Sequence, residues 1–354
     1  MTHSFHSTVH HSIRIFLSSL LLLMLAAPTQ QPALAAGEVG SGSPASCTEA
    51  AFDTALTGGG LVTFNCGPNP HTIGLSAYKQ ISEDTEIDGG GLITLSGNSN
   101  TNHFQVFSAT NLTLRNMSLR NGKGDFGSIQ NFGELVLIDS TVSSNHANLR
   151  AGGIENYGTT TLTRSTVSEN SSTGSGGGIL NEGGEVYLYE SQVLTNTATT
   201  SGAGIYNQTN MTIVDSIING NQAEGIDGAG IFNTGTITIT RTTLAENFGY
   251  NGGGIYNSGS LQMEEVIFER NAVNFGGIGS GAGLYNDSIA SGNRVMFVNN
   301  YAFSYGGGVY NTFNGSLELI NSTLSHNDAT TGGGLVTSGV LTMTHTTVYS
   351  NTAI

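Results

Sequence analysis

The stretch Gly252-Gly253-Gly254-Ile255-Tyr256-Asn257-Ser258-Gly259 recurs along the chain in close copies at an almost constant interval. The apolar residue after the glycines marks each copy, and the marks are Ile129, Ile154, Ile179, Ile205, Ile231, Ile255, Leu284, Val309 and Leu335. Successive marks lie 25, 25, 26, 26, 24, 29, 25 and 26 residues apart. A fixed period in the twenties is typical of a solenoid, in which each repeat buries its apolar face only against its neighbours. We therefore expect one elongated repeat domain.

Apolar residues alternate over short distances within each repeat. They tend to fall six, eight and thirteen places after the mark, as Leu261, Met263 and Phe268 do after Ile255. Three short strands joined by turns and stacked once per repeat describe a parallel β-helix with coils about 4.8 Å apart. The usual hand of parallel crossovers favours a right-handed winding. The sequence thus predicts an all-β, right-handed parallel β-helix of roughly 25-residue coils over residues 85–354.

Two columns of asparagine run along this predicted stack. The first is Asn131, Asn156, Asn181, Asn207, Asn233, Asn257, Asn286 and Asn311, and Thr337 interrupts it. The second is Asn145, Asn170, Asn196, Asn221, Asn247, Asn271, Asn300, Asn327 and Asn351. Asparagine tolerates turn conformations, and stacked amides can hydrogen-bond from coil to coil. Because binding sites are local whereas these residues recur throughout, we interpret both columns as structural.

The repeats resemble those of a known group of bacterial proteins. Glycines before the mark and a later Ser-Thr-x-x-x-Asn motif, as in Gly152, Gly153 and Ile154 followed by Ser165, Thr166 and Asn170, are similar to repeats of the chlamydial polymorphic outer-membrane proteins. They look equally like long secreted β-helix proteins of the pectate-lyase-like superfold. The likeness covers roughly residues 85–354 and implies the β-helix fold. Function has to be argued from sites, because one fold hosts many activities.

The N-terminal segment carries an export pattern. Arg14 precedes an apolar run, Ile15 to Ala27, and a small-residue cleavage pattern follows at Ala33-Leu34-Ala35. These features are typical of a secretory signal peptide over residues 1–35. The apolar run is shorter than the roughly 20 residues of a membrane-spanning helix. We therefore expect a secreted, extracellular or cell-surface protein with no membrane span in the mature chain.

A Gly/Ser/Pro-rich linker is expected over residues 36–46 and an N-terminal cap over 47–84. Thr48 can cap a short helix that ends at Leu56 and plugs the solenoid. Cys47 and Cys66 flank this helix and are the only cysteines, so an exported chain is expected to join them in a disulfide. Closing so short a loop contributes on the order of 3 kcal/mol in the chain-entropy model.

The C-terminal coil ends at Ile354, where the next glycine run is due, and no capping segment follows it. An uncapped coil exposes strand edges that invite association. We therefore expect further coils or an anchoring domain in the native gene, and aggregation of these 354 residues alone, which light scattering would test.

Composition excludes several classes of partner. The chain has 51 Gly, no Trp and a formal net charge of −15 at pH 7. Nucleic-acid binding requires a basic surface, so it is not expected. The glycine runs lack the lysine of a phosphate-binding loop, and no His/Cys spacing of a metal site occurs. We expect neither a metal nor another cofactor.

A charged column, ten places after the mark, contains the best catalytic candidate. Its members are Asp139, Arg164, Glu190, Asp215, Arg241, Glu265, Arg294, Asn321 and His345. Only Glu190 and Asp215 place like charges on adjacent coils. Carboxylates about 5 Å apart are typical of a retaining glycoside hydrolase. The competing interpretation is a solvated ladder in which each arginine screens its acidic neighbours, and such pairs stabilise little.

An aromatic stripe is the best binding candidate. It consists of Tyr206, Phe232, Tyr256, Tyr285 and Tyr310, one place after the mark on five consecutive coils. If the marks point inward, strand alternation points these rings outward. Exposed aromatic surfaces bind glycans or partner surfaces, whereas stacked rings also stabilise sheets. We expect a non-enzymatic, adhesin-like protein that binds a polysaccharide or a cell surface; the alternative is a polysaccharide lyase or glycoside hydrolase.

Overall fold

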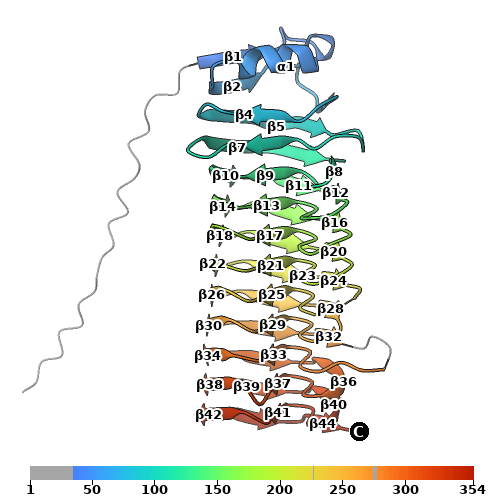
Figure 1. Cartoon of the computed structure of the whole chain (residues 1–354), viewed down its shortest axis with the longest axis vertical. Helices are drawn as coiled ribbons and strands as arrows, with labels where there is room; N and C mark the ends of the chain where they lie inside the picture. The colour runs from blue at the N-terminus through green and yellow to red at the C-terminus, as the bar shows by residue number, and fades with distance from the viewer. Residues whose placement is uncertain (1–34, 226, 274–276) are drawn as a thin grey trace, which may run out of the picture. The chain divides into compact units, whose positions relative to one another are not determined.

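The computed structural model describes residues 35–225, 227–273 and 277–354, and they form a parallel β-solenoid (Figure 1). The predicted signal peptide lies outside the described residues except for Ala35. Each regular coil contributes strands to three parallel stacks, which we call sheets A, B and C. Like positions pair from coil to coil, so that Ile231 lies beside Ile255 and Ile255 beside Leu284. The predicted all-β parallel solenoid is confirmed, and the right hand of the winding stays a prediction.

Among the described residues, sheet B has 11 strands, and from β9 onward each begins with a marked residue. They are β4 (Lys79–Ile81), β6 (Phe104–Val106), β9 (Ile129–Asn131), β13 (Ile154–Asn156), β17 (Ile179–Asn181), β21 (Ile205–Asn207), β25 (Ile231–Asn233), β29 (Ile255–Asn257), β33 (Leu284–Asn286), β37 (Val309–Asn311) and β41 (Leu335–Thr337).

Sheet A follows sheet B in each coil, and in most coils it is bent at two residues, the first of which has positive φ. Before the bend lie β10 (Glu134–Ile138), β14 (Thr159–Thr163), β18 (Glu185–Tyr189), β22 (Asn210–Val214), β26 (Thr236–Thr240), β30 (Ser260–Glu264), β34 (Ile289–Asn293), β38 (Ser316–Ile320) and β42 (Val340–Thr344). After it lie β11 (Thr141–Ser143), β15 (Thr166–Ser168), β19 (Gln192–Leu194), β23 (Ile217–Asn219), β27 (Thr243–Ala245), β31 (Ile267–Glu269), β35 (Met296–Val298), β39 (Thr323–Ser325) and β43 (Thr347–Tyr349). The first coils contribute β1 (Ala35–Val39), β2 (Gly60–Phe64), β3 (His71–Gly74), β5 (Thr85–Ser96) and β7 (Asn111–Arg120).

Sheet C closes each coil with short strands. They are β8 (Lys123–Gly124), β12 (His146–Ala147), β16 (Ser171–Ser172), β20 (Thr197–Ala198), β24 (Gln222–Ala223), β28 (Phe248–Gly249), β32 (Ala272–Val273), β36 (Tyr301–Tyr305), β40 (Asp328–Thr331) and β44 (Thr352–Ala353).

The repeated glycines have two separate physical causes. Gly252 has φ +62°, a left-handed conformation that glycine adopts without steric penalty. Gly254, just before its mark, lies so close to the next coil that an added Cβ would be 2.5 Å from the carbonyl oxygen of Gly283. The first glycine therefore makes the turn into sheet B, and the last one allows neighbouring coils to stack.

The interior combines an apolar core with the two asparagine columns. The marked residue Ile255 and the later Phe268 are fully buried, as is Asn257 of the first column. Asn257 Nδ2 donates to Asn286 Oδ1 at 2.8 Å, and the same bond repeats from Asn131 down to Asn311, which donates to Thr337 Oγ1. The structural interpretation of the columns is confirmed. The amides are buried, and hydrogen bonds from coil to coil hold them in place.

Asparagine tolerance of turn conformations is not the reason for the columns. Neither column contributes a residue with positive φ. The residue before each asparagine of the second column takes that conformation instead, for example Glu246 with φ 56° before Asn247. The left-handed turn aims the following amide into the interior, where it meets the equivalent amide of the next coil.

The cap contains the predicted helix and disulfide. Helix α1 spans Glu49–Leu56, and Thr48 accepts a hydrogen bond from the Ala51 N–H as its N-cap. Cys47 and Cys66 are bonded, with their Cα atoms 5.6 Å apart. Phe52 of α1 is fully buried and stacks with Phe64 of β2 at 5.9 Å between ring centroids. The helix thus covers the end of the apolar core.

The predicted linker over residues 36–46 is wrong. β1 pairs in parallel with β2, Val39 is fully buried opposite Phe64, and Pro44–Ser46 forms a 3-10 helix. Glycine, serine and proline indicate irregular chain by composition. The free edge of β2 overrides that preference, because pairing with it satisfies backbone groups that would otherwise lose their hydrogen bonds to water.

Candidate functional site

The aromatic stripe lies on the outer face of sheet B, as strand alternation predicts. Each ring is partly buried, while the residues on either side, such as Ile255 and Asn257 beside Tyr256, are fully buried. The ring centroids of Tyr206 and Phe232 are 4.9 Å apart, those of Phe232 and Tyr256 are 5.0 Å apart, and those of Tyr256 and Tyr285 are 4.7 Å apart. The stripe is therefore continuous from coil to coil.

The rings do not form a flat platform. The interplanar angles along Tyr206, Phe232, Tyr256 and Tyr285 are 21°, 11° and 10°. Nearly parallel rings at such separations lie face over face with a lateral offset, because side by side in one plane their atoms would overlap. Each ring therefore turns its faces toward the neighbouring rings. The partly exposed surface of the stripe is therefore formed mainly by the edges of the rings.

The last ring of the stripe is arranged differently. Tyr310 is tilted by 51° to Tyr285, at 5.3 Å between ring centroids, and Tyr305 stacks on it at 5.8 Å. Tyr305 comes from the end of β36, so sheet C supplies a further ring at this end of the stripe.

Two carboxylates lie near the middle of the stripe. Burial raises the pKa of Tyr256, and the charges of Asp227 and Asp287 raise it further. Burial likewise raises the pKa of Tyr285 to about 12, with Asp287 and Asp227 among the further causes. Asp227 precedes β25 and Asp287 directly follows β33. The chain thus brings one carboxylate to each side of the strands that carry these phenols.

Toward the N-terminus, the outward column of sheet B that carries the stripe contains polar and aliphatic side chains instead of rings. Gln105 Nε2 donates to Gln130 Oε1 at 2.8 Å, and Gln130 Nε2 donates to Glu155 Oε2 at 2.8 Å. Leu180 follows, and then the aromatic stripe begins at Tyr206. Amides, a carboxylate, an aliphatic residue and aromatic rings therefore share one column of sheet B.

Glu155 belongs to a polar cluster that the sequence analysis did not find. Its side chain is fully buried although it points outward, because Arg150 and Tyr157 cover it. Arg150 Nη1 and the Tyr157 hydroxyl also lie 2.6 and 2.7 Å from Glu182 Oε2. Burial and these carboxylates raise the pKa of Tyr157. Phe132 stacks on Tyr157 at 5.0 Å between ring centroids, so aromatic residues continue beyond the stripe.

The signal for this extension was present in the repeat pattern. Phe132, Tyr157 and Glu182 each stand three places after a mark, next to the column that carries the stripe. The positions one and three places after the mark both point outward, so these three residues belong to the same face as the stripe. The covering of Glu155 by Arg150 could not be found in that way, because it depends on the path of the turn before β13.

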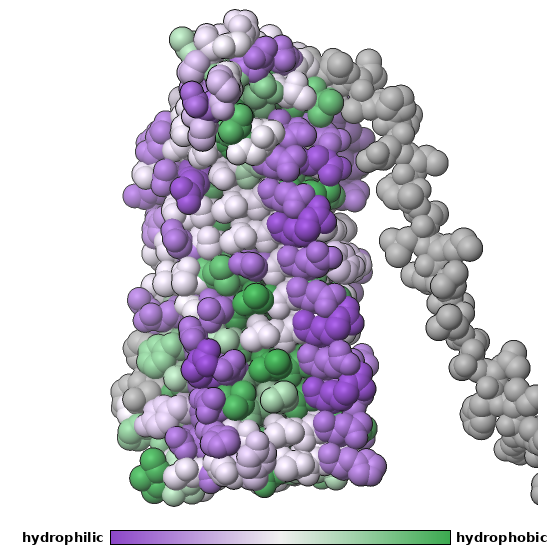
Figure 2. All heavy atoms as spheres, turned by 180° about the vertical axis from the view of Figure 1, so that it is seen from behind, coloured by the Kyte–Doolittle hydropathy of each residue, from purple (hydrophilic) through white to green (hydrophobic). Residues whose placement is uncertain are grey.

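The charged column lies at the bend of sheet A. Every residue of the column has positive φ although none is glycine; φ is 51° at both Glu190 and Asp215, for example. Seen from behind, hydrophilic residues run down the right edge of the solenoid (Figure 2), the edge where β10, β14 and β18 lie in Figure 1. The column is therefore an exposed edge of the molecule.

Glu190 and Asp215 lie on adjacent coils of this edge, and both are exposed. Arg241 Nε and Nη2 donate to the two oxygens of Asp215 at 2.6 and 2.8 Å, and these hydrogen bonds lower the pKa of Asp215. Arg164 makes the equivalent pair with Asp139. The arrangement favours the ladder of exposed ion pairs, each worth at most about 1 kcal/mol. Catalysis by Glu190 and Asp215 stays a hypothesis, which loss of polysaccharide cleavage in Glu190→Gln would support.

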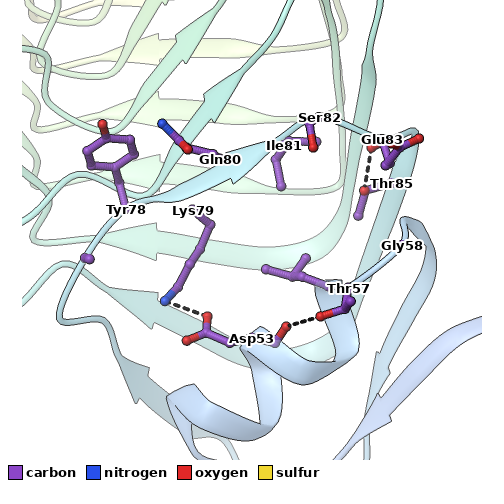
Figure 3. A pocket seen from close by; sticks show the side chains of 12 residues that line it. Asp53, Thr57, Gly58, Tyr78, Lys79, Gln80, Ile81, Ser82, Glu83 and Thr85 are labelled. Carbon is purple, nitrogen blue, oxygen red and sulfur yellow. Dashed lines mark hydrogen bonds and ion pairs between the residues drawn. The ribbon is translucent and has the colours of Figure 1, made fainter.

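A cleft of about 590 Å³ lies between α1 and the first coil (Figure 3). Lys79 points from β4 toward the helix, and its Nζ lies 2.6 Å from Asp53 Oδ1 and 2.6 Å from Glu49 Oε1. Burial raises the pKa of Glu49, but hydrogen bonds from Lys79 and Ser76 outweigh it and bring the pKa to about 2. The charges in this cleft hold the cap on the solenoid.

The Glu49 contacts predict acid sensitivity of the cap. Because the folded pKa of about 2 lies below the ordinary 4.5, the contribution is complete above pH 4.5 and is lost as pH falls toward 2. Glu49→Gln should lower the melting temperature at neutral pH and remove this part of the acid dependence. Glu83→Gln, which changes an exposed carboxylate lining the same cleft, is the control. Equal behaviour of the two variants would contradict the prediction.

Among the residues that the structure describes, no helix is long and apolar enough to cross a membrane. Comparison of the chain with protein-family models gave no match, and neither curated proteins nor solved structures gave a significant match.

Proposed function

We propose that this chain is a secreted or cell-surface, non-enzymatic protein whose sheet B face binds an extended glycan, in an adhesin-like role. The observation that carries the proposal is the aromatic stripe, which continues over five coils on an outward face. The disulfide of the cap supports an oxidising compartment, and the apolar segment at Ile15 to Ala27 supports export.

The geometry specifies how such a ligand is bound. Ring faces are turned toward neighbouring rings, so a sugar chain along the solenoid axis would meet ring edges and the hydroxyl groups of Tyr206, Tyr256, Tyr285 and Tyr310. Successive rings are 4.7 to 5.3 Å apart, which is close to the length of one sugar in an extended β-1,4-linked chain. Hydrogen bonds from phenols to sugar hydroxyl groups, repeated along the chain, supply the affinity.

Two double variants separate binding from folding. Tyr256→Phe with Tyr285→Phe keeps the stacked rings, so we expect the melting temperature to stay unchanged while glycan affinity falls about tenfold or more. Tyr256→Ser with Tyr285→Ser removes three ring contacts, each worth roughly 0.5–1.5 kcal/mol, and should also destabilise the protein. Binding is measured on a glycan array and then by calorimetry.

Tyr189→Phe is the matched control, because this tyrosine is 38% exposed on sheet A, away from the stripe. It should leave binding unchanged. The proposal fails if the double phenylalanine variant binds its glycan or cell surface as wild type does.

A further inference from the structure

The stripe has an asymmetric electrostatic environment. The described segments of sheet B and its flanking turns around the stripe are residues 199–211, 222–225, 227–235, 249–259, 277–289 and 302–316. They contain no Lys, Arg or His. Their ionisable acids are Glu224, Asp227 and Asp287. A ligand on this part of sheet B therefore meets carboxylates, and none of these segments supplies a basic side chain to neutralise them.

Hydrogen bonds hold Asp227 and Asp287 in place beside sheet B. Asn251 Nδ2 donates to Asp227 Oδ1 at 2.9 Å. Asp287 Oδ1 accepts hydrogen bonds from the Thr312 hydroxyl and from Asn314 Nδ2. Both acids are partly buried, and both act electrostatically on Tyr256 and on Tyr285. Their negative potential thus falls on the centre of the stripe from two sides.

This arrangement discriminates among glycans by charge. A uronate chain would bring further carboxylates toward Asp227 and Asp287, and like charges brought together across an interface oppose binding. A protonated amino sugar would instead form charge-assisted hydrogen bonds with these acids, which are stronger than hydrogen bonds between neutral groups. Burial raises the pKa of Asp227, so a nearby cation would also stabilise its ionised form.

We infer that the ligand of the stripe is an amine-bearing glycan chain, with its ammonium groups between Asp227 and Asp287 over Tyr256 and Tyr285. This inference rests on the proposed function and specifies its ligand. Phenolic hydroxyl groups bind the sugar hydroxyls, and the two carboxylates select the amine.

Three hexameric probes test the inference: glucosamine, N-acetylglucosamine and galacturonate oligomers, measured by calorimetry at slightly acidic pH. Wild type should bind the glucosamine hexamer about tenfold more tightly than the N-acetylated hexamer, and the galacturonate hexamer most weakly. Asp227→Asn with Asp287→Asn should reduce the affinity for the glucosamine hexamer about tenfold and leave that for the N-acetylated hexamer within about twofold. Asparagine keeps an oxygen that accepts the bonds from Asn251 and Thr312, so folding should persist.

Glu318→Gln controls for net charge, because this exposed acid lies on β38 of sheet A. It should bind all three probes as wild type does. The inference is overturned if Glu318→Gln weakens glucosamine binding as much as the double aspartate variant, if the double variant binds unchanged, or if galacturonate binds best. Equal binding of the N-acetylated and glucosamine hexamers overturns the inference but leaves the proposed function standing. Failure of wild type to bind any probe counts against both.

Discussion

Replacing Asn221 with leucine is expected to lower the free energy of unfolding by about 4 kcal/mol, a large fraction of the stability of a typical domain. Asn221 Oδ1 accepts from both the backbone N–H and the side-chain Nδ2 of Asn196, each at 3.0 Å. Asn221 Nδ2 donates to the carbonyl of Val193 and to Asn247 Oδ1, also at 3.0 Å. Leucine removes the acceptor of the Asn196 backbone N–H and of one side-chain N–H of Asn196, whose other one still bonds Val167, and it removes the donor to the Val193 carbonyl. Each such loss at a buried group costs about 1–3 kcal/mol.

Urea unfolding of wild type, Asn221→Leu and Asn210→Ala measures this effect. Asn210 is an exposed residue at the start of β22, one sheet away on the same coil, and its replacement should change stability by less than about 0.5 kcal/mol. Hydrogen exchange should show the greatest loss of protection in the coils on either side of Asn221, because each coil contacts only its neighbours. If the leucine variant is as stable as the Asn210 control, the hydrogen bonds of the amide column do not contribute to stability, and the column only fills space.

Acidification from pH 6.5 to about 4 is expected to remove on the order of 3 kcal/mol of stability through His103 alone. The ring is fully buried. Its Nε2 lies 3.1 Å from the carbonyl oxygens of Leu95 and Arg120, and its Nδ1 lies 3.0 Å from Ser128 Oγ. Nε2 therefore carries the hydrogen and donates it, while Nδ1 accepts from the serine hydroxyl.

Burial disfavours the charged ring and outweighs the two carbonyl contacts, so the pKa of His103 falls from 6.5 to about 4. Between these values the unfolded chain binds a proton that the folded protein excludes. Stability from this group is complete above pH 6.5 and declines as pH falls through about 4.

The measurement is the unfolding free energy against pH for wild type, His103→Gln and the exposed control His326→Gln. We expect His103→Gln to be less stable at neutral pH and to show a flatter profile between pH 6.5 and 4, whereas His326→Gln follows wild type. Parallel profiles for wild type and His103→Gln would refute the assignment.

The aromatic stripe shows where prediction from the repeat stops. Alternation correctly placed Tyr256 on the outer face of sheet B, because Ile255 and Asn257 are both buried. Alternation does not give ring orientation. The coil spacing brings neighbouring rings to 4.7 Å, where they must overlap face over face, so the surface offered to a ligand is one of edges and hydroxyl groups.

The charged column shows the same limit. Its spacing correctly gave coil-to-coil neighbours, so Asp215 does lie beside Arg241. Two properties follow from the bend of sheet A: which acidic neighbour each arginine pairs with, and the left-handed backbone at these residues. Neither property is encoded by residue type, since glycine and asparagine rather than arginine or glutamate are the usual residues at positive φ.

The sequence by itself determined the coil length, the parallel stacking, the inward columns, the capping helix and the disulfide. It could do so because a 25-residue period makes every residue the neighbour of its equivalent on the next coil, whatever the turns do. Only the tertiary structure decided that residues 36–46 complete the cap, that Arg150 buries Glu155, and that Asp227 and Asp287 act electrostatically on the same phenols. These contacts join positions that are not equivalent in the repeat, and they depend on how each turn packs over the sheet beside it.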